Sequence, residues 1–197
     1  ELTLERHRRY RWRRDRGIDA GDVITGILIL GGIAAITDAA RDADLKAALE
    51  DAGLAQVATV VASGNALFDP QGRSAADAEA LIARTLSDRF GLDVLVTVRS
   101  RDEVVSAIDN NPFHGEGEDK FVHTHFLENQ PTQAQFDTLL ADHAGRGSEK
   151  LALGERMLFL DYGDGVAESK LTGAFMERRL ESRGTARNMR SLKRILE

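Results

Sequence analysis

The chain of 197 residues is long enough for one large domain or two small ones, and its 42% apolar residues can supply a hydrophobic core. It contains no cysteine, which excludes disulfides, thiolate zinc sites and cysteine nucleophiles and is consistent with a cytoplasmic location. The net charge of −6 is uneven, because residues 1–17 carry +4, residues 18–168 carry −15 and residues 169–197 carry +5. The longest apolar run, residues 24–36, is shorter than the roughly 20 residues of a membrane helix, so we expect no membrane span.

The first 22 residues form a basic N-terminal extension ahead of the first predicted strand. In residues 1–17, ELTLERHRRYRWRRDRG, arginines are interleaved with Tyr10 and Trp12. Arginine pairs with phosphates and aromatic rings stack on bases, so one interpretation is an RNA-binding arm. The interpretation that we favour is a solvated extension, because chain termini are usually untethered.

The next part of the chain, residues 23–110, alternates predicted strands and helices. Apolar periodicity places strands at residues 23–30, 57–62, 66–69 and 92–98 and helices at residues 42–53, 74–90 and 101–110. Ser63, Gly64 and Asn65 form the turn of a predicted hairpin, because Gly and Asn tolerate the positive φ of a tight turn. The order β-α-β-β-α-β predicts a ferredoxin-like antiparallel sheet with both helices on one face.

The remaining residues, 111–197, repeat this order after an exposed loop. The predicted elements are a strand at residues 120–127, a helix at 132–143, a hairpin of 150–154 with 156–162, and helices at 169–182 and 185–196. This second half is therefore predicted to be a βαββα unit followed by a basic C-terminal helix. The predicted fold is α+β, with two ferredoxin-like βαββα repeats packed as one compact unit.

Six separated stretches of the sequence resemble the DUF1697 family, in the same order and over about residues 24–196. They are the run ADLKAALEDAGLAQVATVVASGNALFD, RFGLDVLVTVRS, the NPF that ends at Phe113, HTHFL from His123, SKLT from Ser169 and TARN from Thr185. The resemblance implies a small cytosolic bacterial protein with an α+β, ferredoxin-like architecture. It implies no biochemical activity, because none is established for the family.

The chain departs from the pattern of the family after its first strand. Family members carry a segment like LLRGINVGG there, whereas Gly31 stands here at the Arg position, Ala34 at the Asn position, and Ile36 and Thr37 at the later glycines. An anion-binding role of this loop in relatives would therefore lack its side-chain donors here. The Trp that follows the TRN-like motif of the family is Met189 in this chain.

Several patterns that could carry chemistry have a simpler structural interpretation. Gly31 and Gly32 lack the spacing of a phosphate loop, and Ser63 lies in no nucleophile elbow, so we interpret both places as turns. His123 and His125 lie on one face of a strand, as in a metal edge, but no third ligand is placed by the sequence. The acidic loop at residues 161–168 misses the calcium-loop register. We therefore predict no metal and no cofactor.

The strongest candidate ligand site is at the C-terminal end of the chain. A helix that starts near Ser169 would offer Lys170 and Thr172, and a second helix would present an arginine stripe at Arg183, Arg187, Arg190 and Arg194. The full predicted ligand-binding set is Ser63, Gly64, Asn65, Lys170, Thr172, Arg187, Asn188 and Arg190. The interpretation that we favour for the arginine stripe itself is a solvated face, or one that pairs with the acidic body of the protein.

Three function classes follow from these observations. The basic ends favour binding of a phosphate-bearing ligand or nucleic acid, narrowly ahead of the others. The alternatives are an enzyme acting on a small phosphorylated substrate and a protein-interaction module that uses the acidic body or the sheet edges. The sequence does not indicate a set of catalytic residues or an oligomeric state.

Overall fold

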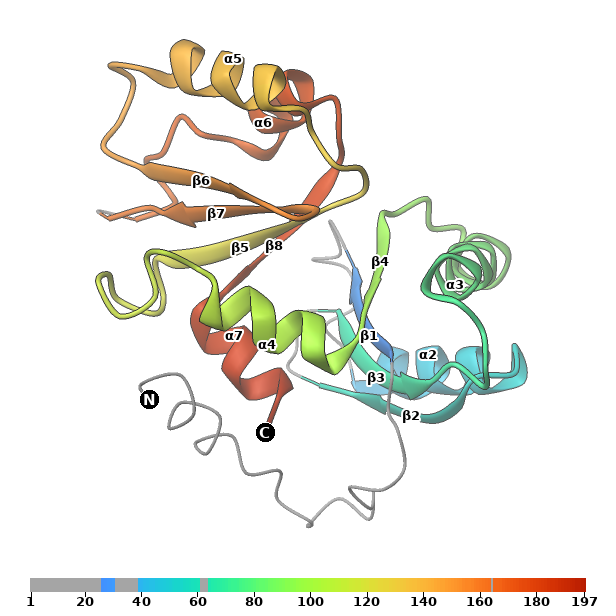
Figure 1. Cartoon of the computed structure of the whole chain (residues 1–197). Coiled ribbons are helices and arrows are strands. Elements are labelled where there is room, and N and C mark those ends of the chain that lie inside the picture. The colour runs from blue at the N-terminus through green and yellow to red at the C-terminus, as the bar shows by residue number, and fades with distance from the viewer. Residues whose placement is uncertain (1–25, 31–38, 61–63, 164) are drawn as a thin grey trace.

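The computed structural model describes residues 26–30, 39–60, 64–163 and 165–197 as a mixed α+β fold with two antiparallel sheets (Figure 1). The strands are β1 Gly26–Leu30, β2 Ala55–Thr59, β3 Asn65–Asp69, β4 Val96–Arg99, β5 Val122–Leu127, β6 Lys150–Gly154, β7 Met157–Asp161 and β8 Gly184–Asn188. The helices are α2 Ala39–Asp51, α3 Ala75–Phe90, α4 Arg101–Asp109, α5 Gln133–His143, α6 Gly173–Leu180 and α7 Met189–Ile195.

The first sheet has the strand order β2-β3-β1-β4, and every neighbouring pair is antiparallel. Helices α2 and α3 cover one of its faces, where Leu49, Phe68 and Ile82 belong to one buried cluster. Helix α3 starts where Ser74 accepts a hydrogen bond from the backbone of Asp77, and it ends at Gly91 with φ of 65°. Each of these features follows from the local sequence.

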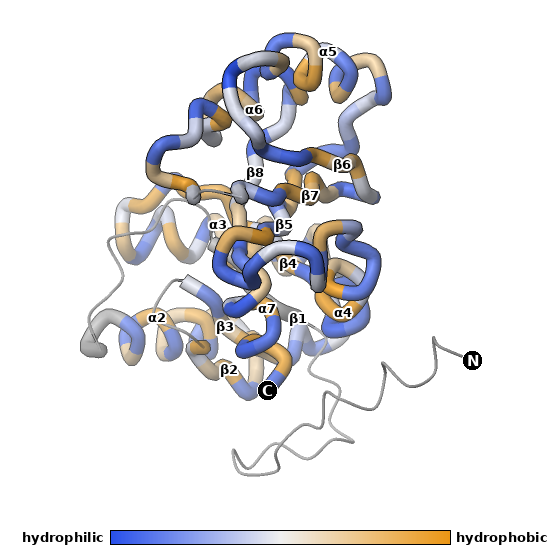
Figure 2. Tube along the Cα trace, turned by 90° about the vertical axis from the view of Figure 1, so that its left-hand side faces the viewer, coloured by the Kyte–Doolittle hydropathy of each residue, from blue (hydrophilic) through white to orange (hydrophobic). Residues whose placement is uncertain are grey.

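The second sheet has the strand order β6-β7-β5-β8 and is also antiparallel throughout. In Figure 1, α5 and α6 lie on one side of this sheet and α4 and α7 on the other. The two faces belong to separate buried clusters, because Leu127 packs with α5 and α6 while its neighbour Phe126 packs with α4 and α7. In Figure 2 the helices carry both hydrophilic and hydrophobic stretches, as expected when only one face is buried.

Helices α4 and α7 connect the two sheets. They pack against each other, and their buried cluster takes in Val60, which follows β2, and Leu67 of β3 together with Met157 and Phe159 of the second sheet. Each helix directly follows the fourth strand of its half, β4 or β8. Helix α4, which the sequence places in the part at residues 23–110, therefore also covers the second sheet.

The predicted helix at residues 185–196 is wrong in its first part. Gly184–Asn188 forms strand β8, paired with β5 from Leu127 to His123, and the helix begins only at Met189. The burial alternates along the strand, with Thr185 and Arg187 inside, which is the period of a strand. The predicted arginine stripe therefore does not exist as one helical face.

Several other predicted boundaries differ from the structure, most of all the starts of α6 and β4. Helix α6 begins at Gly173, not near Ser169, because the Thr172 side chain caps it by accepting from the backbone of Phe175. Strand β4 begins at Val96, not at residue 92. Among the described residues, no helix has both the length and the apolar character that a bilayer crossing requires.

Candidate functional site

Arg187 is the predicted site residue that the structure ties most closely to another. It lies on β8 opposite Thr124, and only 9% of its surface is exposed. Its Nε donates to Asn65 Oδ1 at 2.7 Å, and its Nη1 donates to Thr185 Oγ1 at 3.0 Å and to the Ala186 carbonyl at 2.8 Å. The guanidinium thus joins the start of β3 to β8, across 122 residues of sequence.

The partner of Arg187 is the predicted turn before β3. Gly64 has φ of 73°, and its carbonyl lies 3.5 Å from Arg187 Nη2. Asn65 is buried, with only 3% of its surface exposed. Burial lowers the pKa of Arg187 to about 10, so the side chain is still charged at neutral pH. A buried positive charge is therefore held at the start of β3, beside Gly64 and Asn65.

Arg99 makes a comparable connection from the first half to the second, between β4 and β5. It was not singled out from the sequence. It lies on β4 with 1% of its surface exposed, and its Nη2 donates to the carbonyl of Leu127 at the end of β5 at 3.0 Å. Burial, with a contribution from the nearby charge of Arg156, lowers its pKa. A sequence signal exists, because Thr97-Val98-Arg99-Ser100 matches Thr185-Ala186-Arg187-Asn188 in its Thr, its Arg and its capping last residue.

The carboxylate of Glu79 lies close to the positive charges of both Arg99 and Arg156. Its Oε1 lies 3.5 Å from Arg99 Nη1 and 4.0 Å from Arg156 Nη2, and it also accepts from the backbone of Val98 at 2.9 Å. Arg156 donates in turn to the carbonyl of Glu128 at 3.1 Å. Both cations are engaged by protein groups, so this cluster holds the two halves together.

Helix α7 carries the exposed cations nearest to Arg187 in the sequence. Asn188 caps the helix by accepting from the backbone of Ser191 at 2.9 Å. Arg190 and Arg194 are exposed and lie four residues apart on the helix, whereas Lys193 pairs with Asp119 at 2.5 Å. No ion pair is recorded for Arg190 or Arg194 within the described part of the chain. We call Asn188, Arg190 and Arg194 the α7 surface.

Lys170 and Thr172 belong to a different region of the protein. Lys170 is exposed, and Thr172 caps α6. The adjacent Ser169 donates to Glu149, which also bonds His143 Nε2 of α5 at 3.0 Å. Burial would raise the pKa of Glu149, but the hydrogen bonds from Ser169 and His143 outweigh it and lower that pKa. This buried carboxylate anchors the segment before α6 to α5.

The two histidines of β5 lie on one face of the strand, as predicted. His123 Nδ1 lies 2.9 Å from the carbonyl of Phe121, and its ring meets the edge of Tyr162. His125 is buried, which lowers its pKa to about 4. No group of three or more possible ligands for a metal ion occurs among the residues that the structure describes.

Some sequence predictions lie outside the described residues. These are the N-terminal extension, the loop with Gly31 and Gly32, and Ser63. Of the eight predicted ligand-binding residues, the structure brings Gly64 and Asn65 into contact with Arg187. Asn188 and Arg190 follow Arg187 closely in the chain.

Comparison with known proteins gives a family but no activity. The family model described as "Protein of unknown function (DUF1697)" matches residues 25–159. No curated protein matches the sequence. The solved structure of the conserved bacterial protein SP0830 from Streptococcus pneumoniae is similar, with a TM-score of 0.66 and 16% identity over 88% of this chain and 97% of that chain. At this identity the similarity shows the fold alone.

Proposed function

The chain belongs to the DUF1697 family, whose description assigns no function, and we propose that it binds a phosphate-bearing ligand, nucleic acid included, at the α7 surface. The observation that carries the proposal is the pair of exposed arginines, Arg190 and Arg194, on one helix. Residues four apart on a helix are neighbours about 5–6 Å apart at Cβ, so both guanidinium groups can reach one phosphate or two adjacent ones. Their planar donors match phosphate oxygens.

The buried Arg187 has a different role in this proposal. Its hydrogen bonds with Asn65 and Thr185 occupy it inside the protein, so it positions the turn before β3 beside β8. Asn188 then fixes where α7 starts and hence the direction in which Arg190 points. In this proposal Gly64 and Asn65 hold Arg187 in place and do not contact the ligand. Lys170 and Thr172 are not part of the proposed site, because they lie immediately before α6.

Ionic binding of this kind is tested by its dependence on salt. Labelled single-stranded RNA, double-stranded DNA and ATP are titrated with the full chain by fluorescence anisotropy at low and at moderate salt. We expect binding to weaken with salt, and the double variant Arg190→Ala/Arg194→Ala to flatten the log–log slope by roughly one unit for each lost phosphate contact.

The matched control removes the same charge elsewhere. Arg84 on α3 and Arg178 on α6 are also exposed, and Arg84→Ala/Arg178→Ala should leave the salt slope unchanged. Equal losses in both double variants would mean that only the net charge matters and would refute a site on α7. Absence of binding to all three probes at low salt would refute the function itself.

We also propose that residues 23–110 and 111–197 are two ferredoxin-like repeats, in a cytoplasmic bacterial protein. Both sheets place the first strand of their half between the third and the fourth, and this shared order supports the repeat. The matching positions of Arg99 and Arg187 support it further. Superposing the two halves in a crystal structure tests it, since the repeat requires the two arginines to coincide.

A further inference from the structure

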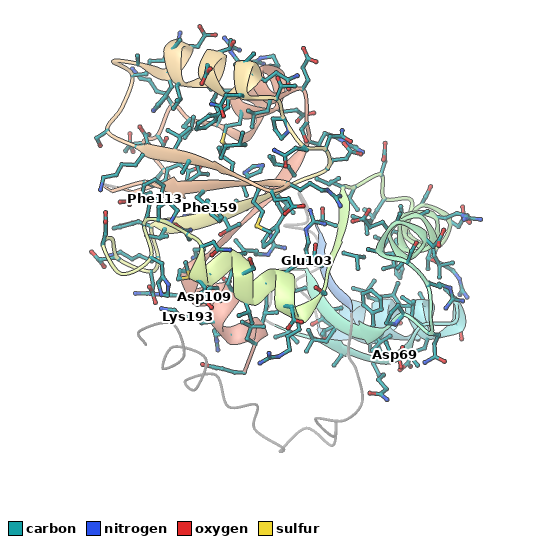
Figure 3. The ribbon with its side chains drawn as sticks, viewed as in Figure 1. Asp69, Glu103, Asp109, Phe113, Phe159 and Lys193 are labelled. Atoms are coloured by element: carbon teal, nitrogen blue, oxygen red, sulfur yellow. The ribbon has the colours of Figure 1, made fainter. Side chains whose placement is uncertain are left out.

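A groove of about 680 Å³ lies between α4 and the hairpin of β6 and β7. Leu153, Met157 and Phe159 supply apolar side chains to its lining. Figure 3 labels Glu103 on α4 and Phe159 on β7, the two elements that form the sides of the groove. Met157 and Phe159 are buried at the base of the groove and Leu153 is half-buried, so the apolar area that an occupant can cover lies around Leu153.

The rim of the groove is acidic. Asp102 and Glu103 lie at the start of α4 and Glu155 in the turn between β6 and β7, and all three are exposed. Glu103 accepts a hydrogen bond from the backbone of Ser100, whereas the carboxylates of Asp102 and Glu155 have no hydrogen bond or ion pair recorded among the described residues. The cation that lines the groove, Arg156, donates to the carbonyl of Glu128. An occupant with positive charge is therefore favoured.

The first described residues of the chain lie on the strand that pairs with β4, the strand before α4. Gly26 starts β1, and the next residue, Ile27, pairs with Arg99. Paired Cα atoms lie about 5 Å apart and successive ones 3.8 Å apart, so Asp102 lies within roughly 16 Å of Ile27. The ten residues from Arg16 to Gly26 can span roughly 33 Å, which is ample to place the residues before Arg16 at the groove.

We propose that this groove binds the arginine-rich segment of the same chain, residues 5–16. This segment holds arginines at positions 6, 8, 9, 11, 13, 14 and 16, together with Tyr10 and Trp12. Its arginines pair with Asp102 and Glu155, and its aromatic rings cover the half-buried Leu153. Because the segment is tethered close to the groove, its effective concentration there is on the order of millimolar, so modest contacts are enough.

Trp12 reports the docking directly, because it is the only tryptophan of the protein. In the full chain we expect its fluorescence to be blue-shifted and protected from acrylamide relative to a synthetic peptide of residues 1–17. The double variant Asp102→Asn/Glu155→Gln should lose this protection, and so should the wild type at high salt. The control Asp88→Asn/Glu168→Gln removes two exposed acids away from the groove and should keep it.

Three results would overturn the proposal. Trp12 in the wild type could be as accessible to acrylamide as in the free peptide, or its protection could survive the change at Asp102 and Glu155. Protection that rises with protein concentration would assign the groove to the segment of a second copy instead of the same chain. Far-ultraviolet circular dichroism of both double variants verifies that a loss of protection does not reflect unfolding.

Discussion

The contact between Arg187 and Asn65 should be a principal tie between the two halves, and a double-mutant cycle measures it. The variants are Arg187→Ala, Asn65→Ala and the double variant. Arg187 Nε and Asn65 Oδ1 are 2.7 Å apart, and both side chains are buried. Removing either one takes away a charge-assisted hydrogen bond from which water is excluded.

The expected size of the effect follows from the bonds of the guanidinium. A hydrogen bond to a charged group contributes roughly 1.5–3 kcal/mol, and Arg187 also bonds Thr185 and the carbonyl of Ala186. Release of a buried charge offsets part of the loss, so we expect Arg187→Ala to lower the free energy of unfolding by roughly 2–4 kcal/mol. The coupling energy between Arg187 and Asn65 should be roughly 1.5–3 kcal/mol.

Urea denaturation followed by circular dichroism gives the four free energies of unfolding. The control cycle uses Arg190→Ala with Asn65→Ala, since Arg190 is exposed and its coupling should stay within about 0.5 kcal/mol. A coupling below about 0.5 kcal/mol for Arg187 as well would refute the inference that this bond holds the halves together.

Two predictions concern β5 and β8. Burial lowers the pKa of His125 from 6.5 to about 4, so the unfolded chain takes up a proton that the folded chain does not, and the free energy of unfolding should fall by roughly 3 kcal/mol as pH drops from 6.5 to 4. His125→Gln should flatten this pH dependence in urea titrations, and an unchanged dependence would contradict the assignment. A Cβ added at Gly184 would lie 2.2 Å from His125 Cδ2, so Gly184→Ala should destabilise by about 1–3 kcal/mol while the control Gly173→Ala, with open space around its Cβ, should not. Thermal melts that rank the two glycine variants equally would contradict the tight packing of the His125 ring on Gly184.

Local patterns predicted most of the fold. Helices α3 and α5 begin within one residue of their predicted starts, because Ser74 and Thr132 cap them and their apolar residues recur at helical spacing. Strand β8 was missed because GTARN has almost no aliphatic residues and its inward positions hold Thr185 and Arg187. Arginine counts as an exposed residue in any hydrophobic pattern, so its burial could not be inferred from the strand alone.

The sequence predicted some members of the candidate site but not how they contact one another. The sequence joined Gly64, Asn65 and Arg187 in one hypothesis, and the structure places them in contact. It did not predict that Arg187 would be buried, because that burial depends on a partner 122 residues away. It also joined Lys170 to the same site, although the segment around Lys170 is held by Glu149 on another part of the second half.

The two proposed binding surfaces are related if α4 and α7 are equivalent helices of two repeats. Ser100 and Asn188 cap these helices at matching positions, which places Asp102 opposite Arg190 in the alignment of the two halves and Ser106 opposite Arg194. At the first of these two positions the first half carries an acid where the second half carries an arginine. If the two halves are repeats, they keep a buried arginine at Arg99 and Arg187 but differ in charge at Asp102 and Arg190, so their equivalent helices would favour ligands of opposite sign. The proposed docking of the arginine-rich segment at the acidic rim would then have the same electrostatic basis as the proposed binding of a phosphate at the α7 surface.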